Sequence, residues 1–89
     1  MKPSSVVLLL NEVEDVKAFC KIASKYDFDI DVRSVDKSSK YTLDAKSLLG
    51  LFSLDLSKPV IVSVENIEGI EASVTDFFNE VAKFTYKEA

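Results

Sequence analysis

The pattern of hydrophobic and polar positions predicts four strands. Residues 6–10 are five consecutive aliphatic residues, which predicts a strand that is apolar on both faces and therefore central in a sheet. Residues 60–64, which are aliphatic except for Ser63, predict another strand. Residues 28–33 alternate with period two, so they predict a strand with one buried and one solvated face. The polar residues 36–40 separate that strand from residues 41–43, and a hairpin is the simplest interpretation.

A first helix is predicted over residues 12–25. Asn11 is a typical N-cap, and Glu14 three residues later would complete a capping box. Apolar residues at spacings of three and four then form one stripe: Val13, Val16, Phe19, Cys20 and Ala23.

Two further helices follow. Asp44 is a suitable cap for a short helix over residues 45–54. Asn66 or Glu68 would begin the last helix. Its apolar stripe is broad and contains Ile70, Val74, Phe77, Phe78, Val81 and Phe84. The polar face of the second strand indicates that helices cover one side of the sheet and leave the other open.

The composition indicates one globular domain spanning residues 1–89. With 89 residues the chain has no room for two cores, and 47% hydrophobic residues are ordinary for a folded protein. The net charge of -4 is spread along the chain without a basic stripe, which argues against nucleic acid as a partner.

Location, redox state and metals are constrained by what the sequence lacks. Cys20 is the single cysteine, so no internal disulfide can form, which fits a reducing cytoplasm. The longest apolar run is too short for a membrane span or a signal peptide, and we expect a cytoplasmic protein without membrane contact. Without histidine no metal site is expected, and Glu65, Glu68 and Glu71 are interpreted as a solvated face. No cofactor is expected.

One segment carries a resemblance to a known family. Residues 46–54, KSLLGLFSL, resemble the short second helix of HPr, the phosphocarrier of the bacterial sugar phosphotransferase system. Residues 19–26 are similar to the back half of that family's first helix. The resemblance implies an α+β fold, an HPr-like open-faced β-sandwich of order βαββαβα with a four-stranded antiparallel sheet. The longer spacing from Ile30 to Ser47 suggests an extended hairpin here.

The chain departs from the family where phosphate would be carried. The family has a histidine, an arginine and a proline at the start of its first helix, and the matching positions here hold Glu12, Glu14 and Asp15. Carboxylates stabilise a helix N-terminus but repel an incoming phosphate. The expected site is therefore a degenerate active-site loop, and the chain has no histidine elsewhere.

Ser47 matches the regulatory serine that is phosphorylated in many HPr proteins and in the histidine-less catabolite-repression HPr. With Asp44 as the cap, Ser47 would lie in the first helical turn, where a phosphate could reach Lys46. The alternative is a serine that only packs or caps the helix.

Two apolar surfaces are candidate interfaces. Leu48, Leu49 and Phe52 match the patch with which HPr proteins dock their partners, and we expect Leu48 or Leu49, with Phe52, to be exposed. The alternative buries all three under the sheet. Lys46 beside them is a further candidate for partner binding. Val7, Leu9 and Ile61 would face the open side of the sheet and could form a homodimer there, unless they are scattered surface residues.

These residues together favour a non-catalytic regulatory or protein-interaction domain, similar to catabolite-repression HPr and not an enzyme. The resemblance implies HPr kinase or a transcriptional regulator as partners. Two alternatives remain open: a degenerate member with a structural or dimerisation role, and a phosphocarrier that uses another residue such as Glu12.

Overall fold

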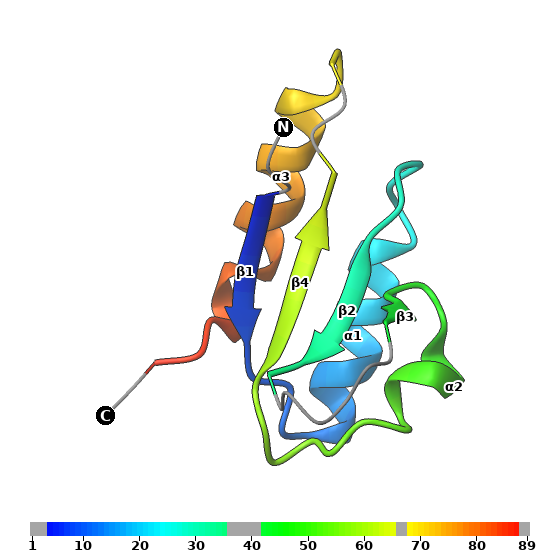
Figure 1. Cartoon of the computed structure of the whole chain (residues 1–89), viewed down its shortest axis with the longest axis vertical. Coiled ribbons are helices and arrows are strands. Elements are labelled where there is room, and N and C mark those ends of the chain that lie inside the picture. The colour runs from blue at the N-terminus through cyan, green and yellow to red at the C-terminus, as the bar shows by residue number, and fades with distance from the viewer. Residues whose placement is uncertain (1–3, 36–41, 66–67, 88–89) are drawn as a thin grey trace.

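Four antiparallel strands form a single sheet in the order β1-β4-β2-β3 in the computed structural model of the chain (Figure 1). The structure describes residues 4–35, 42–65 and 68–87. The strands are β1 (Ser4–Leu8), β2 (Asp31–Ser34), β3 (Leu43–Asp44) and β4 (Val60–Val64). The pairing of β2 with β3 confirms the hairpin interpretation, although its polar segment and Tyr41 lie outside the described residues.

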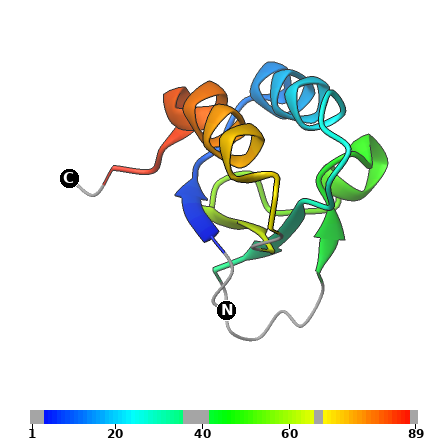
Figure 2. The ribbon, with the colours of Figure 1, turned by 90° about the horizontal axis from the view of Figure 1, so that it is seen from above.

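The described helices all pack against the same face of the sheet, and none of them covers the opposite face (Figure 2). They are α1 (Val13–Ala23), α2 (Leu48–Leu51), α3 (Glu71–Val81) and the short 3-10 helix η1 (Ala82–Phe84). The element order βαββαβα and the one-sided helical layer confirm the expected open-faced α+β sandwich.

The core lies between the sheet and the helices and is built from the predicted stripes. Val16, Phe19 and Ala23 of α1 are fully buried, and Cys20 is a buried free thiol, as expected for a small core residue. Val13 is the exception in that stripe, because its side chain at the helix start is 49% exposed. In α3 the central residue is Phe77, which is fully buried.

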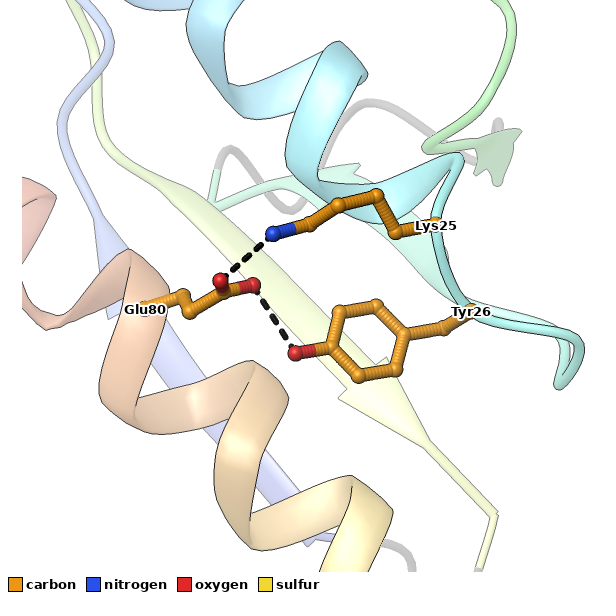
Figure 3. A network of polar contacts seen from close by, with 3 residues as sticks. All are labelled: Lys25, Tyr26 and Glu80. Atoms are coloured by element: carbon orange, nitrogen blue, oxygen red, sulfur yellow. Dashed lines mark hydrogen bonds and ion pairs between the residues drawn. The ribbon is translucent and has the colours of Figure 1, made fainter.

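Phe77 organises an aromatic cluster that joins three parts of the chain. Its ring centroid lies 6.4 Å from that of Phe19, 5.5 Å from Tyr26 and 6.2 Å from Phe28, with edge-on or tilted geometry. These are the preferred arrangements of aromatic pairs. Beside the cluster, Glu80 of α3 accepts hydrogen bonds from Lys25 and Tyr26 just after α1 (Figure 3).

Each of the three helices α1, α2 and α3 has a different N-cap residue from the one predicted. Glu12, not Asn11, is the N-cap of α1, and no side-chain hydrogen bond caps it, so the capping box does not form. The backbone of Glu12 is extended (φ -114°, ψ 147°), which carries Asn11 away from the first free N–H groups. The helix is also shorter at its C-terminal end than the predicted residues 12–25.

The last helix begins later than predicted. Its N-cap is Ile70, whereas Glu68 lies in the preceding turn and Asn66 lies outside the described residues. Gly69 in that turn has φ +99°, in the left-handed region that favours glycine. Because of this turn, α3 begins at Glu71, three residues after Glu68.

Candidate functional site

The short helix α2 begins at Ser47, which caps it with its own side chain. The backbone of Ser47 is extended (φ -98°, ψ 98°), and its Oγ accepts a hydrogen bond from the Gly50 N–H at 3.3 Å. Asp44, the predicted cap, instead belongs to β3, and the predicted helix over residues 45–54 is reduced to Leu48–Leu51.

The sheet delays the start of α2. The Ala45 N–H donates to the carbonyl of Ile30 at 2.9 Å and keeps the chain beside β2. The Asp44 carboxylate accepts from the Lys46 N–H at 2.9 Å, so it closes a local turn instead of capping a helix. Ser47 is the next residue able to cap, and the helix starts there.

Lys46 is held away from Ser47. Its Nζ donates to the carbonyl of Phe28 at 3.0 Å, so the ammonium group lies over the loop between α1 and β2. Lys46 would have to release this carbonyl to meet a phosphate on Ser47.

The apolar residues of α2 divide between core and surface. Leu51 is fully buried, whereas Leu48 and Phe52 are each 37% exposed and Leu49 is 88% exposed. We name the surface of Leu48, Leu49 and Phe52 the α2 patch. The alternative in which all three are buried is wrong, and all three are exposed beside the exposed Ser47.

Gly50 lies tightly against the cap of the same helix. A Cβ atom added at Gly50 would lie 3.1 Å from Ser47 Oγ and 3.5 Å from Ser47 Cβ. The first distance is shorter than most Cβ contacts, so the glycine leaves room for the serine hydroxyl.

The acidic residues expected at the degenerate active-site loop lie at the N-terminal end of α1. Glu12 and Glu14 are exposed, Asp15 is partly buried, and Glu14 forms an exposed ion pair with Lys17 at 3.5 Å. Helices α1 and α2 contact each other on the helical face, and the start of α1 lies toward the same end of the molecule as α2 (Figure 1). The structure therefore groups the acidic helix start and the α2 patch at one end.

The C-terminal segment was missed by the sequence reasoning. After η1 the chain pairs with the outer edge of β1: the Leu9 N–H donates to the Phe84 carbonyl at 2.8 Å, and the Tyr86 N–H donates to the Val7 carbonyl at 3.0 Å. Phe84, Thr85 and Tyr86 are all strand-favouring residues, which was the available signal. This segment and Asp15 border a shallow hollow next to the start of α1.

The three residues expected on the open face differ in exposure. Val7 is 38% exposed, whereas Leu9 and Ile61 are partly buried. Val7 and Ile61 are paired across β1 and β4, but Leu9 lies beyond the end of β1. The first strand thus runs from Ser4 to Leu8, two residues earlier than predicted.

Within 4–35, 42–65 and 68–87, no group of three or more histidine, cysteine, aspartate or glutamate residues could hold a metal ion. No helix in this described part of the chain is long and apolar enough to cross a membrane.

Comparisons with known proteins identify the fold. No protein-family model matches the sequence, and no curated protein matches it either. Among solved structures, the crystal structure of HPr-C-His from Thermoanaerobacter tengcongensis is similar, with a TM-score of 0.63, 21% sequence identity and complete coverage of both chains. The chain therefore has an HPr-like fold over its whole length.

Proposed function

We propose that this chain is a non-catalytic, HPr-like regulatory domain that binds a protein partner through the α2 patch and cannot carry phosphate on histidine. The α2 patch supports the proposal most directly. Leu49 is 88% exposed although its neighbour Leu51 is fully buried, and Leu48 and Phe52 extend the same apolar surface. Apolar anchors at the centre of a surface are typical of protein interfaces.

The residues themselves support the proposed absence of carrier chemistry. The chain contains no histidine, and the start of α1 holds Glu12, Glu14 and Asp15. Three carboxylates at that end oppose the approach of a phosphoryl group. Phosphate on Glu12 would form an acyl phosphate, which is poorly matched to exchange with phosphohistidine.

Ser47 is the proposed switch of this surface. Ser47 is exposed, and its Oγ accepts a hydrogen bond from the Gly50 N–H. Leu48 and Leu49 follow it directly in the chain. A phosphate on Ser47 would carry roughly -1.5 to -2 charges and bring them to the border of the α2 patch. The added charge would change which partner the patch accepts.

Incubation with HPr kinase and ATP, followed by mass spectrometry, tests the switch. We expect one phosphate on Ser47 in the wild-type chain and none in Ser47→Ala. Ser53→Ala is the matched control, because Ser53 is an exposed serine of the same segment whose hydroxyl donates to the Gly50 carbonyl. Phosphorylation of Ser47→Ala, or an unmodified wild-type chain, would contradict the proposed switch.

Two further measurements separate this function from its alternatives. Incubation with enzyme I and phosphoenolpyruvate should leave the chain unmodified, and any acid-labile or acyl phosphate would establish a carrier instead. A transcriptional regulator of the catabolite-repression class should bind the phosphorylated wild-type chain more tightly than Leu49→Asp. If neither kinase nor regulator recognises the chain, the structural role becomes the better account.

A further inference from the structure

The open face of the sheet carries two adjacent rows of side chains with complementary properties. The ladder register places Ser5, Ser63, Asp31 and Asp44 in one row, and Val7, Ile61 and Arg33 in the next. The residues between the rows point to the helices, since Val32 and Val62 are fully buried. Both rows therefore project from the face that no helix covers (Figure 2).

We infer that two copies of this chain associate face to face through this open sheet surface. A two-fold axis that runs across the strands, midway between the two rows, exchanges one row with the other. It places Asp31 of each copy opposite Arg33 of the other, which makes two equivalent ion pairs. The contact is self-complementary, as a two-fold interface requires.

The same two-fold rotation also matches the sizes of the side chains that face each other. Ser63 of one copy faces Ile61 of the other, and Ser5 faces Val7, so each aliphatic side chain meets a small one. Two sheets that pack face to face need interdigitating side chains at a separation of about 10 Å. The alternation of serine and aliphatic residues along β1 and β4 satisfies that need.

The two charged residues are available for such pairs. Asp31 and Arg33 are both exposed. Neither side chain has a hydrogen bond or an ion pair with any residue in ranges 4–35, 42–65 and 68–87. They lie two positions apart on one face of β2 and form no ion pair with each other, so both can pair across the two-fold axis.

The face is small, which sets the strength of the association. The longest strands, β1 and β4, have five residues and are about 17 Å long, and four strands side by side span roughly 19 Å, so each copy covers only a few hundred Å². Stable interfaces cover about 800 Å² per partner. We therefore expect a weak dimer that forms at about 0.1–1 mM protein, because its interface lies at the low end of the range of interface sizes.

Sedimentation velocity of the full chain from about 10 μM to 1 mM tests the inference. The wild type should shift reversibly from monomer to dimer. Asp31→Arg and Arg33→Asp each place like charges opposite one another, and each should weaken dimerisation by about tenfold or more. The double variant carrying both changes exchanges the signs and should restore the dimer.

A mixing experiment makes the geometry explicit. Asp31→Arg and Arg33→Asp, each monomeric alone, should form a heterodimer when mixed, because every facing pair is then opposite in charge. Asp76→Arg is the control, since it makes the same charge change on an exposed position of α3 and should leave dimerisation unaltered. Far-ultraviolet circular dichroism checks that each variant is folded.

Several results would overturn the inference. One is a wild type that stays monomeric throughout the concentration range. A second is a wild-type dimer that neither single variant weakens, and a third is a mixture of the two variants that remains monomeric.

Discussion

The phenol hydroxyl of Tyr26 donates a hydrogen bond to Oε2 of Glu80, 2.8 Å away, and joins the segment after α1 to α3 (Figure 3). The second oxygen of Glu80 accepts a hydrogen bond from Lys25, so one carboxylate holds two neighbouring residues just after α1. Lys25 is largely exposed and its ion pair contributes little to stability. The partly buried Tyr26 bond is the stronger of the two ties, because water competes less for it.

Removing the Tyr26 hydroxyl should weaken this tie without disturbing the ring. Tyr26→Phe keeps the aromatic contact with Phe77 and loses only the bond to Glu80. We expect the free energy of unfolding at pH 7 to fall by about 0.5–1.5 kcal/mol, measured by urea denaturation. Tyr86→Phe is the control and should change stability by less than about 0.5 kcal/mol, because Tyr86 is exposed.

The same variant should change the response to high pH. Burial of the phenol, followed by its bond to Glu80, raises the pKa of Tyr26 from 10.0 to about 12. The folded state thus holds this proton more tightly, so its stabilisation is complete below pH 10 and is lost as the pH rises toward 12. The stability difference between wild type and Tyr26→Phe should shrink over that range; a constant difference would contradict the assignment.

Acid should weaken the contact between Tyr26 and Glu80 by protonating the Glu80 carboxylate. The hydrogen bond from Lys25, and then that from Tyr26, lower the pKa of Glu80 below its ordinary 4.5. Its stabilisation is therefore present above that ordinary value and is lost as the pH falls through the lowered pKa. Glu80→Gln should flatten this acid dependence in urea denaturation at successive pH values. An acid dependence equal to that of the wild type would exclude the role assigned to Glu80.

Phe77 should be among the most sensitive positions of the core. Phe77→Ala removes a fully buried ring that contacts four other aromatic residues, and we expect a loss of about 3–5 kcal/mol in the free energy of unfolding. Thermal unfolding followed by circular dichroism measures it. The neighbouring Phe78→Ala should cost less, because Phe78 is only partly buried, and equal losses would argue against the described core.

Two leucines of α2 should separate stability from binding. Leu51→Ala should cost about 2–5 kcal/mol, since Leu51 is fully buried. Leu49→Ala should change stability by less than about 0.5 kcal/mol, yet it should weaken partner binding measured by titration calorimetry. A large stability loss in Leu49→Ala would mean that its 88% exposed side chain packs elsewhere.

Ser47 and Gly50 should show energetic coupling. Ser47→Ala should cost about 1 kcal/mol through the lost cap. In the wild type, Gly50→Ala meets Ser47 Oγ at 3.1 Å, which offsets the helix preference of alanine. With Ser47→Ala present the hydroxyl is gone, so adding Gly50→Ala should then stabilise by up to about 1 kcal/mol. Chemical denaturation of the four proteins measures the cycle, and strictly additive effects would contradict the contact.

The buried side chains could be predicted from the sequence because hydrophobic periodicity reports burial directly. Val60–Val64 is β4 as predicted, and the stripes of α1 and α3 supply the core. The fold class followed from the same pattern together with the resemblance of residues 46–54. For the candidate site, the exposure of Leu49 and Phe52 was also anticipated.

Helix starts could not be predicted in the same way, because several residues near each start are able to cap. Asp44 and Ser47 are both good capping residues, and the choice depends on the hydrogen bond from Ala45 to Ile30, which joins distant parts of the chain. Likewise, nothing local indicates that Thr85 lies opposite Leu8. Pairings of this kind are decided by the tertiary structure.

The attachment of the C-terminal segment to β1 has a consequence for synthesis. β1 leaves the ribosome before the other described elements, yet its two neighbours in the sheet are β4 and the segment containing Thr85. Its contacts therefore span nearly the whole chain, which is a high contact order. Helix α1 and the β2–β3 hairpin can form while translation continues, but β1 remains without either neighbour until the later part of the chain has emerged. The aliphatic strand β1 should be the segment that chaperones protect on the nascent chain.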